Sequence, residues 1–311
     1  MKREIVNWLN DGPSWLQYAV QLQLINGKPD INLVMDGDKI VKIIDRIKDK
    51  QVGIPALKTG KVLYTKTGNA YWDLFFLADI GLTIDELNLE KEIDQILDLQ
   101  RPDGTFVTQE NIRPNYFCIP TILMSSIVKM GYKNDSRLDK YIEIILETQR
   151  LDGGWHCAKS RAKGQKLQDT ESCPMDNLNI LMLLSQYEEY RNDKRFEGAI
   201  DLLLNHWYRK DENWRPYGFG VGKDFKKLKY PAIKYGILRV LDVLSLFPYA
   251  IKSRGFNEML EFVQQRADNG KYFAESVVKS YAEFDFGQKK EPSRWITFLV
   301  NRIEKRINEC K

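Results

Sequence analysis

Three segments of the chain place apolar residues at the spacing of one helix face and polar residues on the other. Residues 89–100 read LEKEIDQILDLQ, residues 138–149 read LDKYIEIILETQ, and residues 256–264 read FNEMLEFVQ. Acids and lysines fill the polar positions of the first two, and acids fill those of the third. Each segment is therefore predicted to form a helix with one face in water.

A second class of segment is apolar on most faces, which is typical of buried helices. These segments are 116–132 (YFCIPTILMSSIVKMGY), 173–184 (CPMDNLNILMLL) and 230–247 (YPAIKYGILRVLDVLSLF). Pro120, Pro174 and Pro231 lie near their starts. Proline is tolerated there because the first amides of a helix have no partner within the helix.

The half-polar and apolar segments alternate, and about six of each are found along the chain. The outer, half-polar candidates begin near Lys2, Lys39, Leu89, Arg137, Arg195 and Phe256. The inner, apolar candidates begin near Pro13, Tyr71, Tyr116, Cys173, Tyr230 and Ser293. An open stack of such pairs needs polar ends, but Trp15 and Trp295 make both ends apolar, so we expect the ends to meet.

The predicted fold class is therefore all-α, with residues 1–311 forming one domain. Its architecture is an α/α toroid in which about six outer and six inner helices close a double-walled ring. An open helical solenoid is the alternative.

Three similar turns join outer to inner segments. They read QRLDGGW at 149–155, QRPDGTF at 100–106 and QRADNGKYF at 265–273. Aspartate and glycine favour a tight turn, and a glutamine at the end of a helix can satisfy backbone groups left without partners. The tryptophan ring would cover the joint, so the repeated turn is predicted to be a structural fastener lying outside the mouth of the ring's cavity.

These turns resemble the Gln-Trp repeat of squalene–hopene and oxidosqualene cyclases and the matching repeat in the β subunits of protein prenyltransferases. Residues 149–155 match in full, whereas Phe106 and Phe273 stand where the repeat has tryptophan. Both families are α/α toroids with a central cavity. The resemblance implies a small apolar or isoprenoid-like molecule as the partner of this chain.

Aromatic residues near the inner segments are the candidate lining of that cavity. Their ring faces can stabilise a cation, although packing in the core is the simpler explanation for any one of them. The candidate substrate-binding residues are Trp72, Tyr116, Trp155, Trp214, Tyr217 and Tyr235.

The acid motif of the cyclases, Asp-x-Asp-Asp, is absent, and so is the magnesium-diphosphate motif Asp-Asp-x-x-Asp. Asp176, in the first turn of an apolar segment, is the candidate catalytic proton donor, because burial raises the pKa of a carboxyl. Stabilisation by the helix dipole is the alternative explanation. Asp73 and Asp242 are weaker candidates, and Arg239 is expected to pair with Asp242.

A metal site would need ligands from His156, Cys157 and Cys173. Their spacing matches no structural zinc motif, and adjacent side chains rarely point at one ion. The zinc set of the prenyltransferases is poorly matched by Glu171 and Cys173. We therefore expect no bound metal and no cofactor.

Two other functions remain open on the sequence alone. One is a carbohydrate-active toroid, for which Glu171 and Asp176 are the only candidate carboxylate pair. The other is a non-catalytic binding module.

A net charge of +4 with interspersed signs does not favour nucleic acid as a partner. The absence of a long apolar run and of a disulfide pattern among four cysteines leads us to expect a cytoplasmic protein with no membrane span.

Overall fold

The computed structural model describes residues 2–35, 37–106, 117–156, 171–212 and 214–310. Within these ranges the chain is all-helical, with no β-strand and only isolated β-bridges between short turns. No helix in the same ranges is long and apolar enough to cross a membrane. The predicted all-α class is confirmed.

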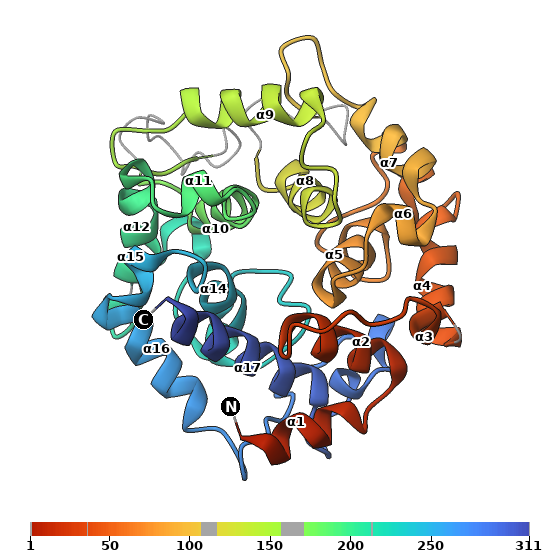
Figure 1. Ribbon diagram of the computed structural model, residues 1–311. Coiled ribbons are helices and arrows are strands. Elements are labelled where there is room, and N and C mark those ends of the chain that lie inside the picture. Colours follow the sequence, from red (N-terminus) through yellow and green to blue (C-terminus); the bar gives the residue numbers. More distant parts are fainter. Residues whose placement is uncertain (1, 36, 107–116, 157–170, 213, 311) are drawn as a thin grey trace.

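The apolar segments form helices at the centre of the molecule (Figure 1). Each contacts the next in chain order, and the last contacts the first, so the contacts make a closed cycle. These central helices are α2 (Ser14–Gln23), α5 (Ala70–Ile80), α8 (Pro120–Lys129), α10 (Pro174–Leu184), α14 (Ile237–Leu244) and α17 (Arg294–Glu309). All residues of α10 are buried, as expected for a helix that is apolar on most faces.

The half-polar segments form helices around the outside of this group (Figure 1). They are α1 (Arg3–Asn10), α4 (Asp38–Lys48), α7 (Glu90–Leu97), α9 (Ser136–Glu147), α12 (Glu197–Tyr208) and α16 (Arg254–Gln264). In α9 the buried residues are Leu138, Tyr141, Ile142 and Ile145, which is the apolar face that the sequence predicts.

Short helices fill the connections. The α-helical ones are α3 (Asn32–Met35), α6 (Ile84–Leu87), α11 (Glu188–Arg191), α13 (Lys223–Lys226) and α15 (Pro248–Ile251). The 3₁₀-helices are η1 (Ile54–Thr59), η3 (Lys194–Phe196), η4 (Pro216–Gly218), η5 (Lys279–Tyr281) and η6 (Asp285–Gly287).

The two ends of the described chain pack against each other, as predicted from their apolar residues. Trp15 and Trp295 meet edge to face with ring centroids 5.3 Å apart. The Arg294 guanidinium lies over the Trp8 ring at 4.7 Å, and its Nε donates to the Trp8 carbonyl at 3.0 Å. This contact joins the last central helix to the first outer one.

One predicted inner helix begins later than expected. Residues 230–236 are not helical, and α14 starts only at Ile237. The two tyrosines of this segment have separate partners. The Tyr230 hydroxyl donates to Asp79 at 2.9 Å, and the Tyr235 ring packs on His206 with ring centroids 5.0 Å apart. The expected start of the third inner helix near Tyr116 lies outside the described residues, and α8 begins at Pro120.

The first two repeated turns are fastened by their glutamines. Gln100 Nε2 donates to the Gly104 carbonyl at 2.9 Å and to the Arg137 carbonyl at 2.6 Å. Gln149 Nε2 makes the same pair of bonds to Gly153 at 2.7 Å and to Arg195 at 2.8 Å. Each glutamine therefore closes its own turn and holds the start of the next outer helix.

The glycines of these turns are required by both conformation and space. Gly104 and Gly153 have φ of +87° and +85°, a region that side chains rarely adopt. A Cβ on Gly153 would lie 2.8 Å from the Gly198 Cα in α12. The turn thus packs directly against the next outer helix. The third turn differs, since no side-chain hydrogen bond of its glutamine, Gln265, is found among the described contacts.

Candidate ligand site

Two adjoining cavities lie between the central helices, near the carboxyl ends of α5, α8 and α10. The larger has an empty volume of about 640 Å³ and the smaller about 290 Å³, each including space open to solvent. They share Phe75, Asp79, Arg239 and Asp242 in their walls. No residue of the three repeated turns belongs to either wall, as their predicted position outside the cavity requires.

Apolar side chains make up much of these walls. They come from α5, α10, α14 and α17 and from the segments that precede and follow α14. The apolar wall residues are Phe75, Ala78, Met182, Tyr230, Ala232, Leu238, Val243, Leu246 and Leu299.

The larger cavity has an opening toward the outside. A third, wider space of about 920 Å³ shares Arg191, Leu246 and Arg306 with it. Arg306 is anchored by Asp242 and Ser245, at 3.0 Å and 3.1 Å from its Nη1. Leu246 is half-buried and lines both spaces.

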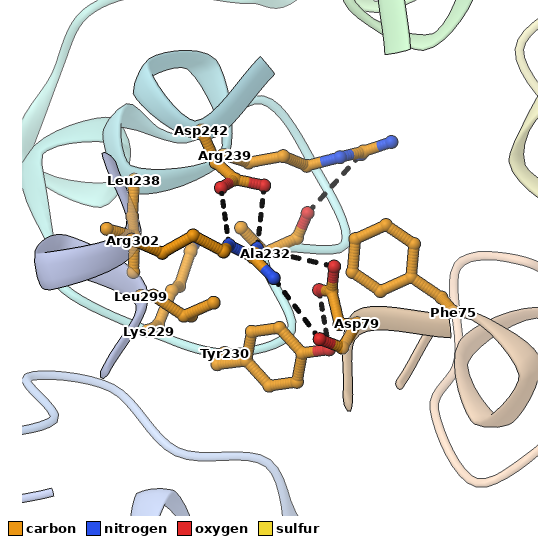
Figure 2. Close-up of a pocket in the computed structure, with 10 residues that line it drawn as sticks. All are labelled: Phe75, Asp79, Lys229, Tyr230, Ala232, Leu238, Arg239, Asp242, Leu299 and Arg302. Carbon is orange, nitrogen blue, oxygen red and sulfur yellow. Dashed lines mark hydrogen bonds and ion pairs between the residues drawn. The ribbon is translucent and has the colours of Figure 1, made fainter. Parts of the chain in front are cut away.

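Buried Asp79 and half-buried Asp242 organise the charged part of the walls (Figure 2). Asp79 accepts from Lys129 Nζ at 2.6 Å and from the Tyr230 hydroxyl at 2.9 Å. Asp242 accepts from Arg302 Nη2 at 2.9 Å, and Arg302 also reaches Asp79 at 3.4 Å. Arg302 therefore links the two carboxylates.

These contacts change the protonation of the groups involved. Burial alone would raise the pKa of Asp242, but the guanidinium groups of Arg302 and Arg306 lower that pKa to about 2. Burial and the neighbouring Asp79 raise the pKa of Tyr230 well above its usual value. Asp242 is therefore ionised and Tyr230 is neutral at physiological pH.

Several cations in the walls also satisfy helix ends. Arg302 Nη1 donates to the Asp79 carbonyl at 3.2 Å, and Arg306 Nη1 donates to the Asp242 carbonyl at 3.0 Å. Arg191 Nε donates to the Ser185 carbonyl at 2.7 Å, just after α10. The last carbonyls of a helix lack intrahelical partners and carry partial negative charge, which explains why cations gather at this end of the central helices.

Arg239 differs from these cations. It lies in the first turn of α14, is 5% exposed, and makes no ion pair with any described residue. Its hydrogen bonds go to the Asn179 side chain, to the Ala232 carbonyl at 3.5 Å and to Met182 Sδ at 3.6 Å. Its Nε has no partner among the described residues.

Aromatic rings flank the Arg239 guanidinium. Its Cζ lies 5.7 Å from the centroid of Trp72 and 5.6 Å from that of Phe75. Burial lowers the pKa of Arg239 to about 10, so the group keeps its charge at neutral pH. A buried, charged guanidinium with neutral partners therefore faces both cavities.

The expectation that Arg239 pairs with Asp242 is wrong. Asp242 is held by Arg302 and Arg306, and the Arg239 side chain points away from that pair (Figure 2). Residues three apart on a helix are neighbours, but here Arg302 arrives from another helix and takes the Asp242 carboxylate. The sequence signal for this site is an arginine inside the apolar segment 230–247.

The predicted aromatic residues fall into separate places. Trp72 lies beside Arg239, and its Nε1 donates to the Tyr64 carbonyl at 2.6 Å. Trp155 packs against Phe196 in the second turn, with ring centroids 6.3 Å apart. None of these rings lines either cavity directly.

Trp214 and Tyr235 come together around a histidine instead. Their ring centroids lie 4.8 Å and 5.0 Å from that of His206, which is buried. Burial lowers the pKa of His206 to about 4, so the imidazole is neutral at pH 7. Tyr116 lies outside the described residues, and Tyr217 lies in η4 with its side chain outside them.

The candidate acids also occupy different surroundings. Asp176 is fully buried in the first turn of α10 and is not part of either cavity wall. Glu171 is exposed and accepts from Trp214 Nε1 at 3.0 Å. Asp73 accepts from Arg46 Nε at 2.6 Å and from Arg46 Nη2 at 2.7 Å, which is the arrangement of a structural ion pair. The catalytic role of Asp176 stays a prediction.

The proposed metal ligands are described only in part. His156 and Cys173 are buried, and Cys157 lies outside the described residues. No three His, Cys, Asp or Glu side chains within the described ranges are placed to hold a metal ion.

Elemental analysis of the protein purified without chelator is expected to show well under one zinc per chain. The reason is that His156 and Cys157 are adjacent in sequence and rarely share one ion. About one zinc per chain in the wild type, lost in Cys173→Ser, would contradict this prediction.

Comparison of the chain with protein-family models and with curated proteins finds no match.

Proposed function

We propose that this chain is a closed α/α toroid of the squalene cyclase and protein prenyltransferase type, and that it binds a small isoprenoid-like or other apolar ligand between its central helices. The closed cycle of contacts from α2 to α17 supports the architecture. The glutamine bonds in the first two turns support the resemblance, because they give the repeated sequence a common structural role.

The observation that carries the proposal is the pair of adjoining cavities among the central helices. They lie between the central helices, and small-molecule sites in helical bundles are found between helices. Such sites combine apolar surface with polar groups held in fixed positions, and both are present in these walls. Phe75 and Leu238 provide apolar surface close to the charged side chains.

Binding is the activity that this geometry supports best. The only carboxylates in the described walls are Asp79 and Asp242, and both accept from cations. Asp242 is ionised and held by guanidinium groups, and the Asp79 oxygens accept from Lys129 and Tyr230, so neither residue is placed to donate a proton that starts a cyclisation. If the ligand is transformed, Asp176 is the candidate proton donor.

Farnesol is a suitable probe because it is a neutral isoprenoid alcohol. Titration calorimetry of the wild-type protein is expected to show farnesol binding. Leu246→Trp should weaken it by about tenfold or more, equivalent to about 1.4 kcal/mol, because a larger side chain in the cavity wall takes up space that the ligand needs.

Leu151→Trp is the matched control, since Leu151 is fully exposed in the second turn. It should bind farnesol as the wild type does. Equal binding by both tryptophan variants, or no binding by the wild type, would contradict the proposal.

A further inference from the structure

The positive charges in the cavity walls have unequal surroundings. The cations that line the two cavities are Lys129, Arg191, Lys229, Arg239, Arg302 and Arg306. Most of them meet a carboxylate: Lys129 pairs with Asp79, Lys229 with Asp224 outside the cavity, and both Arg302 and Arg306 with Asp242.

Arg191 and Arg239 are the two that make no ion pair with a described residue. Arg191 is half-exposed and donates to the Ser185 carbonyl at the end of α10, so water and a helix end stabilise its charge. Arg239 is buried and lies in the first turn of α14, where the helix dipole is unfavourable to a cation. Arg239 is therefore the one wall cation that has neither an ion pair with a described residue nor a helix end beside it, and only the longer-range attraction of Asp79 and Asp242 offsets its burial.

Burying a charged group without a counter-charge costs several kcal/mol, even after the protein relaxes. The flanking rings of Trp72 and Phe75 offset part of that cost through cation–π attraction. They also cover the ring-facing sides of the guanidinium. Nη1 donates to Ala232 and Nη2 donates to Asn179 and Met182, whereas Nε has no partner among the described residues. The Nε–H group can donate a charge-assisted hydrogen bond to one carboxylate oxygen.

We infer that Arg239 recognises a single negative charge on the ligand, and that the ligand is an apolar molecule ending in one carboxylate. One guanidinium without an ion pair matches one negative charge, whereas a doubly charged head group would leave a buried negative charge unpaired. The apolar walls around Arg239, including Leu238 and Ala232, fit the remainder of such a molecule. This inference rests on the proposed function, because it assigns the ligand class of the same cavities.

Farnesoate and farnesol test the inference, because they share a carbon skeleton and differ in the charged end. In calorimetric titrations at pH 7 the wild type is expected to bind farnesoate about thirtyfold more tightly than farnesol. That factor is the lower end of the range for one partner of a buried charge pair. Arg239→Met should reduce farnesoate affinity to the level of farnesol and leave farnesol binding within about threefold.

Arg254→Met is the control. Arg254 is exposed on α16, so this substitution removes the same charge from the surface. It should retain the wild-type preference for farnesoate. Arg239→Gln removes the charge but keeps hydrogen-bonding groups, and it decides the question if Arg239→Met fails to fold, because it should also lose most of the preference for farnesoate.

Equal affinity of the wild type for the two probes would overturn this inference and leave the proposed function standing. An unchanged preference in Arg239→Met would also overturn it. Absence of binding by both probes would overturn both proposals.

Discussion

Arg302→Met is expected to lower the free energy of unfolding by about 3–5 kcal/mol, the range for removing one partner of a buried ion pair. The Arg302 side chain is 3% exposed and contacts both Asp79 and Asp242. Methionine has a similar length but no charge. The two carboxylates would keep Lys129 and Arg306 but lose the group that joins them.

Urea denaturation at pH 7, followed by far-ultraviolet circular dichroism, measures this loss. Arg254→Met is the control for a surface arginine and should change the free energy by no more than about 0.5 kcal/mol. A loss in Arg302→Met that is no larger than in the control would show that the buried network contributes little.

The same variant should respond differently to acid. In the wild type the pKa of Asp242 is lowered to about 2, so its stabilising contribution is present above about pH 4 and is lost as the pH falls toward 2. In Arg302→Met that pKa should rise, because burial remains while one guanidinium is gone. The difference in stability between wild type and variant should therefore shrink as the pH falls from 5 toward 2.

The helices were predictable because their signal is local. A helix such as α9 needs only one apolar face at the right spacing, and Tyr141, Ile142 and Ile145 on that face are buried while Leu146 at its end is half-buried. The central helix α10 was equally clear, since polar positions are few along it. Periodicity within about a dozen residues was sufficient in both cases.

The start of α14 was less predictable because the segment before it is also apolar. Residues 230–236 have the composition of an inner helix, yet Tyr230 is held by Asp79, a residue 151 positions earlier in the chain. A contact of that range leaves no trace in local periodicity. Tertiary contacts therefore overrode the helical pattern at this point.

The candidate site shows the same limit more strongly. Arg302 lies 223 positions from Asp79, and the two meet only because α17 lies among the central helices. Sequence spacing suggested that Arg239 and Asp242 pair, being three residues apart on one helix. In the structure Asp242 pairs with Arg302 instead. Only this tertiary contact shows that Arg239 makes no ion pair with a described residue.

The role of the repeated glutamine was predicted in kind but not in detail. We expected it to satisfy carbonyls at the end of its own helix. Gln149 instead bonds Gly153 and Arg195, and the last turn of α9 is served by Trp155, whose Nε1 donates to the Ile145 carbonyl at 2.7 Å. The tryptophan is therefore both the cover of the joint and the partner of the helix end.

Trp155→Ala should accordingly be one of the most destabilising single substitutions in the chain, at about 3–5 kcal/mol. Trp155 is fully buried and lies against Phe196 with ring centroids 6.3 Å apart. Alanine would leave a cavity between the second turn and α12, and it would remove the donor from the Ile145 carbonyl. Thermal unfolding should show a fall in Tm of several degrees, since about 1 kcal/mol corresponds to about 2–4 °C in large domains.

Trp214→Ala separates this effect from the loss of any tryptophan. Trp214 is half-exposed, and its Nε1 bonds the exposed Glu171, so its removal opens little buried space. Its Tm should fall by clearly less than that of Trp155→Ala. Gln149 and Trp155 hold the same joint, so Trp155→Ala should also leave the Gln149 bonds strained. The double variant Gln149→Ala/Trp155→Ala should therefore lower the free energy of unfolding by less than the sum of the two single variants. An unchanged Tm in Trp155→Ala would show that the second turn is not a structural fastener.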